Sequence, residues 1–279
     1  MTLSSQLAGS RPARSVSLDL DSPELAATYD RVSTRQFDHG KVLIAELRAK
    51  PGGKVLDVGC GTGRLGDYVA NLLGPDSRVL GVDPLPLRIE IAARKNPRFT
   101  ATVGRAEDLS QFEDAEFDAL YANSVFHWVE DKPRALREFF RVLKSGGRFA
   151  INSADADRPH QSASLVREAV LEEGLNDAAA ASGFGTNYRV SGDGLTELIR
   201  AAGFTNVEVK AHTFVDDVSG VDDLIAWSSS SSFGNFLSDL DSEELTRVRA
   251  RLNQKLDALR QGSVVKLQRH LVFATASKP

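Results

Sequence analysis

The chain has 279 residues, 42% of them hydrophobic and 26% charged, and its formal net charge is −4. This composition is typical of a folded globular protein, and the length suffices for one large domain with an appended cap. The charge balance argues against nucleic acid as a partner. The single cysteine, Cys60, excludes an internal disulfide. No apolar run reaches the roughly 18 residues of a membrane span, so we expect a cytoplasmic monomer or homodimer that binds no membrane.

The first part of the chain alternates between strand and helix patterns. Residues 1–20 hold serines and arginines without an apolar periodicity, and we expect a disordered leader there. Pro23 begins a short helix that Ser22 caps, and a second helix runs from about Phe37 to Arg48. Strands are then expected at 54–59, 78–82, 99–104, 117–122 and 147–152, and helices at 63–73, 86–94 and 132–143. This alternation predicts a parallel sheet with helices on both faces.

The alternation is interrupted twice after Ser153. Residues 154–191 and 214–262 are expected to be insertions, separated by a helix over 193–202 and a strand over 207–212. Asp241 and Glu244 form a capping box that opens an amphipathic helix, and 264–276 supply a last, antiparallel strand. The predicted class is α/β: one Rossmann-like domain over 21–279, with a core at about 40–153. It has a seven-stranded sheet and a helical cap built from the N-terminus and both insertions.

A glycine-rich loop follows the strand expected at 54–59. Gly59, Gly61 and Gly63 lie within five residues, and glycine is needed where φ is positive or where a ligand approaches the backbone closely. Asp83 ends the next apolar run, 20 positions after Gly63. A strand, a glycine loop, a helix, a second strand and an acid together cradle a nucleoside and hold its ribose. The sequence therefore predicts a cofactor that contains adenosine.

The loop pattern alone allows two cofactors. Gly61, Gly63 and Gly66 satisfy the G-x-G-x-x-G pattern of dinucleotide sites, where loop amides receive a pyrophosphate. Asp57, two residues before the first glycine, would repel a diphosphate and suits a cation. S-adenosylmethionine (SAM) carries a sulfonium and an ammonium and no phosphate, so the charge favours SAM over NAD. An NAD(P)-dependent dehydrogenase is the alternative, although the chain has no Tyr-x-x-x-Lys pair for hydride chemistry.

Five segments, the glycine loop among them, carry a family resemblance. Taken in order, Asp57–Gly63, Gly81–Asp83, Gly104–Leu109 and Arg141–Gly147 resemble the successive motifs of the class I SAM-dependent methyltransferases, covering roughly residues 25–153. The segment Asn123–Val129 is similar to the branch that methylates carboxyl groups of trans-aconitate and malonyl carriers. The resemblance implies SAM as cofactor and a small molecule as substrate.

The resemblance also implies which residues contact the cofactor. Asp57 is expected to meet the methionine ammonium and Asp83 the ribose hydroxyls; helix capping is the alternative for each. Glu107 is expected near the adenine amine, although Arg105 replaces a common aspartate and Asp108 or water is an alternative contact. The full set is Asp57, Gly59, Cys60, Gly61, Gly63, Asp83, Pro84, Ala106, Glu107, Asn123 and Ser124.

His127 is the candidate catalytic residue, because an imidazole titrates near neutrality and can orient a substrate or take a proton. A structural histidine is the alternative. By resemblance the N-terminal helices fold over the cofactor. The candidate substrate contacts are Tyr29, Phe37, His39 and Trp128, with packing as the competing interpretation. The candidates to hold an anionic substrate are Arg158, His160, Arg189 and His212, and for each of them taken alone a surface position is the favoured alternative.

Several chemistries are disfavoured by the same region. Asn123 is not followed by the two prolines that organise nucleic-acid base methyltransferases. Asp155 and Asp157 are the local candidates for a hard cation, and we expect a solvated loop there and no metal. The analogy favours a carboxyl or hydroxyl oxygen as acceptor. Nitrogen, sulfur or carbon acceptors and a catalytically inactive SAM-binding module are the alternatives.

Overall fold

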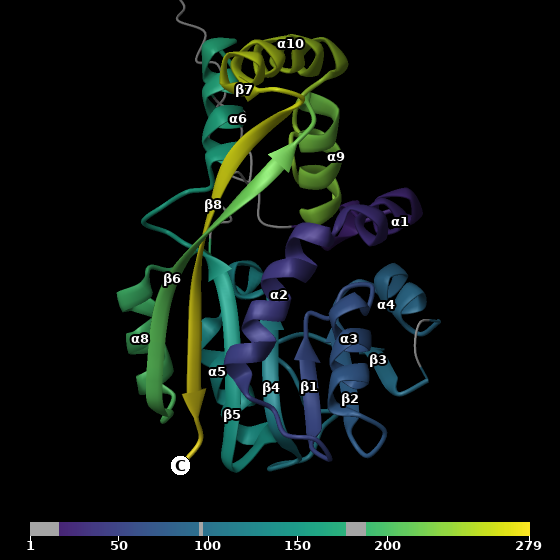
Figure 1. Ribbon diagram of the computed structural model, residues 1–279, viewed down its shortest axis with the longest axis vertical. Helices are drawn as coiled ribbons and strands as arrows, with labels where there is room; N and C mark the ends of the chain where they lie inside the picture. Colours follow the sequence, from purple (N-terminus) through teal and green to yellow (C-terminus); the bar gives the residue numbers. More distant parts are fainter. Residues whose placement is uncertain (1–16, 95–96, 177–187) are drawn as a thin grey trace, which may run out of the picture.

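The protein is described by a computed structural model over residues 17–94, 97–176 and 188–279. One sheet runs through the molecule in the order β3-β2-β1-β4-β5-β8-β6 (Figure 1). The first five strands of that order are parallel, and β8 is antiparallel to both β5 and β6. The strands are β1 (Lys54–Val58), β2 (Arg78–Asp83), β3 (Phe99–Val103), β4 (Phe117–Asn123), β5 (Leu143–Ala154), β6 (Thr205–Val218), β7 (Arg260–Gln261) and β8 (Val264–Ser277).

Helices cover both faces of the sheet. The α-helices are α1 (Pro23–Val32), α2 (Thr34–Leu47), α3 (Arg64–Leu73), α4 (Pro86–Ala92), α5 (Lys132–Val142), α6 (Gln161–Glu172), α8 (Gly192–Ala201), α9 (Val221–Ser231) and α10 (Ser242–Leu259). Two 3-10 turns, η1 (Leu18–Leu20) and η2 (Phe126–Trp128), complete the set in the described ranges. Leu43 of α2 and Val69 of α3 join one apolar cluster, and Phe139 of α5 and Leu195 of α8 join the cluster on the opposite face.

The border between β1 and β4 is the point where the chain changes faces. The helix that follows β1 is α3, on one face, and the helix that follows β4 is α5, on the other. In open parallel sheets a crevice forms at the carboxyl ends of two such strands. Asp57 and Tyr121 are paired across this border, so the crevice opens directly above them.

A helical cap stands beyond the carboxyl edge of the sheet (Figure 1). The helices α6, α9 and α10 bury Val166, Leu224 and Leu252 in one apolar cluster with Val265 of β8. The capping box predicted at Asp241 is confirmed, since its side chain accepts from the amides of the first turn of α10 while the Glu244 side chain accepts from the Asp241 amide. The cap is therefore attached to the sheet through the long strands β6 and β8.

The predicted α/β class and parallel core are confirmed, with two differences. The sheet has an eighth strand where seven were expected, because the two-residue β7 pairs with the start of β8. The strand expected at 207–212 runs from Thr205 to Val218. Polar residues such as Asp217 hide this extension in the sequence, yet Asp217 forms an ion pair of 2.9 Å with Lys266 across the ladder.

Parts of two predicted segments lie outside the described residues, namely 1–16 of the leader and 177–187 of the first insertion. The described end of the leader contains η1, and the Ser17 amide donates a hydrogen bond to Asn235 Oδ1. In the described ranges, no helix combines the length and apolar character that crossing a bilayer requires.

Gly66 of α3 packs directly on Phe99 of β3. A Cβ atom built at Gly66 would lie 2.3 Å from a ring carbon of Phe99. We expect Gly66→Ala to lower the free energy of unfolding by about 1–3 kcal/mol, the usual cost of overpacking, although alanine is the better helix former. Urea unfolding measures this, and the penalty should shrink in a Phe99→Leu background. An equal penalty in both backgrounds would contradict the packing argument.

Candidate active site

A cavity of about 220 Å³ lies at the carboxyl ends of β1, β2 and β4. Its wall contains the glycine loop, the end of β2, the segment after β3 and the segment after β4, together with Leu18 and Phe233 from the parts of the chain that cover the edge of the sheet. Of the predicted cofactor residues, it is lined by Gly59, Gly61, Asp83, Pro84, Ala106, Glu107, Asn123 and Ser124.

The glycine loop borders this cavity. Gly59, Gly61 and Gly63 all have positive φ, at 73°, 54° and 77°, a region that residues with a side chain rarely occupy. A Cβ atom at Gly59 would lie 2.1 Å from Val125 Cγ2. A side chain at Gly59 would therefore collide with the segment after β4, so glycine lets the loop pack against Val125 at the edge of the cavity.

Asp57 is buried at the end of β1. Its Oδ2 accepts a hydrogen bond of 2.8 Å from the Tyr121 hydroxyl. Burial raises the pKa of Asp57 to about 8, against the lowering effect of that hydrogen bond. Asp57, Cys60 and Phe37 line a smaller cavity that also includes Tyr29 and Asn123, two residues of the larger cavity. A buried carboxyl group with a raised pKa is suited to a cationic partner.

Asp83 connects the end of β2 to the glycine loop. Its Oδ2 accepts from the Gly61 amide at 2.9 Å and its Oδ1 from the Leu85 amide at 3.0 Å. Burial raises its pKa, while Arg88 and the two amides act in the opposite direction. Each carboxylate oxygen has a second lone pair, so Asp83 orders the loop and still has capacity to accept ligand hydroxyls.

The structure distinguishes Glu107 from Asp108, the two acids considered as contacts of the adenine amine. Glu107 lines the larger cavity and is half-buried, whereas Asp108 is exposed and accepts a hydrogen bond from the Ser110 amide. Burial lowers the pKa of the nearby Lys132 to about 8, and Glu107 opposes that shift. Glu107 is thus the acid in position to face a bound nucleoside.

A hydrogen-bond network fixes the segment after β4. The Asn152 side chain accepts from the Ser124 amide at 2.6 Å and donates to Asn123 Oδ1 at 2.8 Å. Asn123 in turn donates to the Gln36 carbonyl of α2 at 3.0 Å. Ser124 itself has φ of 60°, an uncommon conformation for a residue other than glycine. The network therefore holds Ser124 in a strained position at the sheet edge.

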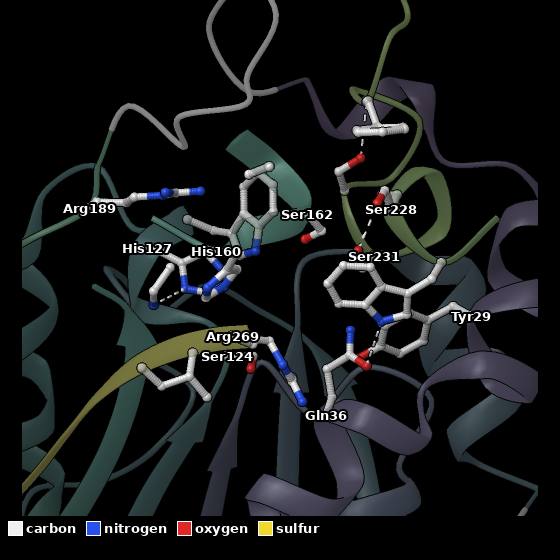
Figure 2. Close-up of a pocket in the computed structure, with 17 residues that line it drawn as sticks. Tyr29, Gln36, Ser124, His127, His160, Ser162, Arg189, Ser228, Ser231 and Arg269 are labelled. Atoms are coloured by element: carbon white, nitrogen blue, oxygen red, sulfur yellow. Dashed lines mark hydrogen bonds between the residues drawn. The ribbon is translucent and has the colours of Figure 1, made fainter. Parts of the chain in front are cut away.

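A second cavity, of about 130 Å³, adjoins the first (Figure 2). The two share four lining residues: Tyr29, Ser124, Trp128 and Ser231. The wall of the second cavity is completed by α2, α6, α9, β8 and the segment before Val190. The predicted residues Tyr29 and Trp128 thus stand where the two cavities meet, and a molecule in the second cavity would face a ligand in the first.

The second cavity is rich in hydrogen-bond donors. Arg189 and Arg269 line it, and none of the described residues that line it is an aspartate or glutamate. The backbone amides of Ala154 and His270 donate to Nδ1 of His127 and His160, each at 3.2 Å. Burial lowers the pKa of both imidazoles, that of His127 to about 3. Both histidines are therefore neutral and carry their hydrogen on Nε2.

The structure shows which of the other predicted substrate contacts line the second cavity and which do not. Phe37 packs edge-on against Tyr68 and lines the small cavity beside Asp57, away from the second cavity. His39 is fully buried behind Ser124. Of the four candidates for an anion, His160 and Arg189 reach the second cavity. The other two do not line it: Arg158 pairs with Asp155 at 2.9 Å, and His212 Nε2 lies 3.4 Å from Glu46 Oε1.

Two buried arginines were not predicted. Arg88 of α4 donates to the Ser230 carbonyl at 2.6 Å and lies 4.2 Å from the ring centre of Tyr29. Arg269 stands between Leu267 and Leu271, which are both buried, on the inward side of β8. The alternation of apolar and polar residues along this strand could have predicted that Arg269 faces the core. Arg88 had no comparable signal, because its partners come from distant segments.

Three comparisons place the chain among known proteins. It matches the family described as a methyltransferase domain over residues 56–151. It is 34% identical over 180 residues to the 2-phytyl-1,4-naphtoquinone methyltransferase of Synechococcus elongatus, covering 59% of this chain and 75% of the relative. It is 27% identical over 242 residues to the trans-aconitate 2-methyltransferase of Deinococcus radiodurans, covering 85% and 91%. The solved YcgJ protein of Bacillus subtilis has the same fold, with a TM-score of 0.56, 20% identity, and 86% and 98% coverage.

The sheet order, the glycine loop and the acid that ends β2 define a Rossmann-like nucleoside-binding protein. The chain belongs to the class I SAM-dependent methyltransferases, and its cofactor is SAM. This membership decides between the two cofactors that the glycine pattern allowed. The third glycine of that pattern, Gly66, lines none of the three cavities and serves helix packing.

The buried state of Asp57 predicts proton release when SAM binds. At pH 6.5 the free protein holds Asp57 mostly protonated, because its pKa is raised to about 8. If the ionised carboxylate pairs with the SAM ammonium, binding at this pH releases close to one proton. Between pH 6 and 7 the affinity then rises with pH.

Calorimetry at pH 6.5 in buffers of different ionisation enthalpy counts the protons released. Asp57→Asn is the control and should release none. Equal proton release by the wild type and this variant would contradict the pairing of Asp57 with the ammonium.

Proposed function

We propose that this chain methylates a carboxylate oxygen of a small molecule with SAM as methyl donor. The observation that carries the proposal is the second cavity, which meets the cofactor cavity and has Arg189 and Arg269 in its wall. Among the described lining residues it has no acid. Such a wall favours an anionic acceptor over an amine, which is cationic at neutral pH. The relative named for trans-aconitate acts, by its name, on a carboxylic acid.

Two arginines lie in the wall of the second cavity, and Arg189 is proposed as the one that meets the acceptor. Asp216 forms an ion pair of 2.9 Å with Arg269 and does not line the cavity. Burial lowers the pKa of the Arg189 guanidinium, which means that its charge is costly in the free protein. An acceptor carboxylate beside Arg189 would offset that cost. Arg189 is therefore proposed as the anchor of the acceptor.

The proposed chemistry requires no general base. SAM, when bound, supplies a methyl group on a sulfonium, which is already activated for in-line displacement. A carboxylate has a pKa of about 4 and is ionised at neutral pH, so its oxygen attacks the methyl carbon as the carbon–sulfur bond breaks. The protein then contributes position and exclusion of water. A hydroxyl acceptor, the other oxygen considered, would need a base.

His127 is proposed to touch the acceptor as a hydrogen-bond donor. Its Nδ1 already accepts from the Ala154 amide, and Nε2 carries the hydrogen. With its pKa lowered to about 3, the imidazole is a weak base at neutral pH. Of the two roles expected for His127, orientation of the substrate is therefore favoured over proton removal.

The cofactor residues are proposed to act as their positions suggest. Asp57 would face the methionine ammonium, Asp83 the ribose hydroxyls, and Glu107 the adenine amine, with the glycine loop against the ligand backbone. The N-terminal helices and the segments 154–191 and 214–262 are proposed to form the cap of a single domain over 21–279. That cap would shape the acceptor cavity, to which α6 and α9 contribute Ser162 and Trp227.

The decisive experiment supplies the protein with SAM labelled in its methyl group and a panel of mono-, di- and tricarboxylic acids, trans-aconitate among them. Alcohols and amines of matched size serve as controls. Methyl esters release volatile labelled methanol in mild base, whereas ethers and methylamines do not. We expect base-labile label with acids alone. Label in amines would overturn the carboxylate assignment, and SAM binding with no labelled product from a cell extract would indicate an inactive module.

Arg189 and Arg158 form a matched pair for testing the anchor. Loss of a hydrogen bond to a charged group costs about 1.5–3 kcal/mol. We therefore expect Arg189→Gln to raise the KM for the acid methylated in the panel by about 10- to 100-fold, with SAM affinity unchanged. Arg158→Gln, outside the cavity, should stay within about threefold of wild type. Equal effects in steady-state kinetics would refute the anchoring role.

A further inference from the structure

Three side chains from distant parts of the chain form a buried hydrogen-bond series that ends where the two cavities meet. Arg269 of β8 lies with its NH1 atom 2.7 Å from His39 Nδ1, and His39 Nε2 lies 2.7 Å from Ser124 Oγ. His39 is fully buried and Arg269 is 5% exposed. Figure 2 shows Ser124 and Arg269 among the residues in the wall of the second cavity.

The direction of each hydrogen bond follows from the chemistry of arginine. A guanidinium has donors alone, so His39 Nδ1 must accept and cannot carry a hydrogen. The neutral imidazole then has its hydrogen on Nε2 and donates to Ser124 Oγ. The hydroxyl hydrogen of Ser124 is consequently directed away from His39. His39 is thus unable to remove a proton from Ser124 or from a substrate.

Both ends of the series are held in place. The NH2 atom of Arg269 donates to Asp216 Oδ1 at 2.9 Å and to the Arg35 carbonyl at 3.4 Å, which leaves NH1 aimed at His39. At the other end the Ser124 amide donates a hydrogen bond to Asn152 Oδ1, and the φ angle of Ser124 is 60°. A strained residue persists when its surroundings over-determine it, and such residues cluster at functional sites.

We propose that Arg269 and His39 hold the Ser124 hydroxyl as a hydrogen-bond donor to the acceptor carboxylate at the point of methyl transfer. Ser124 is the residue that touches the acceptor, and His39 and Arg269 are positioning residues. A donor to one carboxylate oxygen orients the other toward the methyl group without removing any proton. The inference rests on the proposed function for the identity of the acceptor, whereas the hydrogen-bond series itself is independent of it.

The charged and titratable groups that influence His39 all lower its pKa. Burial lowers the pKa of His39 well below its usual value, and Arg269 of β8, His160 before α6 and His127 of η2 lower it further. From β6, the ring of Phe214 lies 5.7 Å from that of His39 and Asp216 pairs with Arg269. The series therefore keeps its direction throughout the neutral pH range.

The state of His39 can be read without any acceptor. Nitrogen-15 NMR of the full chain labelled in histidine, with the His39 signals assigned by their loss in His39→Gln, distinguishes the two neutral tautomers from the imidazolium. We expect the tautomer with hydrogen on Nε2 from pH 6 to 8.5, with and without S-adenosylhomocysteine. Hydrogen on Nδ1, or an imidazolium in this range, would overturn the series whatever the acceptor is.

The role of the hydroxyl is tested by a double-mutant cycle with the acid methylated in the panel. Ser124→Gly removes the hydroxyl and tolerates the positive φ, so it should fold. We expect it to lower kcat/KM for the acid, measured at saturating SAM, by about 10- to 100-fold. His39→Phe should cause a similar loss alone and no further loss in the Ser124→Gly background, and His39→Gln, which retains a donor, should recover part of the activity.

Two outcomes would overturn the positioning role. One is a wild-type kcat/KM in Ser124→Gly, and the other is an equal additional loss from His39→Phe in both backgrounds, which a structural role of His39 would produce. The two proposals fail separately. Absence of base-labile product from any acid refutes carboxylate methylation, whereas the tautomer measurement still decides whether the series exists.

Discussion

The change of face between β1 and β4 is the constraint on which the rest of the structure depends. Because α3 and α5 pack on opposite faces, a crevice forms above the two strands, and parallel strands place their carboxyl ends at the same edge. Asp57 ends one strand and Ser124 follows the other. The glycine loop, the second cavity and the hydrogen-bond series from Arg269 all adjoin this one crevice.

The crevice has an electrostatic polarity along its length. At one end the buried carboxyl group of Asp57 has a raised pKa and suits a cation. Towards the other end Arg189 lines the wall and the histidines are neutral donors. Ionised groups are costly in such surroundings unless a partner of opposite charge arrives. The arrangement therefore matches a cationic donor and an anionic acceptor meeting near Ser124.

The position of a residue in the site was predictable from the sequence when its partners are close to it along the chain. The loop and Asp83 belong to one strand-helix-strand unit, so their spacing alone indicated the site. Phe37 and His39 were grouped together, yet residues two apart on a helix point in nearly opposite directions. Phe37 accordingly meets Tyr68, and His39 meets Ser124.

The sequence by itself determined the α/β alternation, the glycine loop and the two acids that adjoin it, Asp57 and Asp83, because each depends on interactions within a few tens of contiguous residues. Tertiary structure alone decided which of the scattered arginines and histidines reach the second cavity. It also decided the histidine tautomers, because the partner of His39 lies 230 residues away in the chain. Burial and donor direction are properties of packed neighbours, and packing joins segments that no local pattern connects.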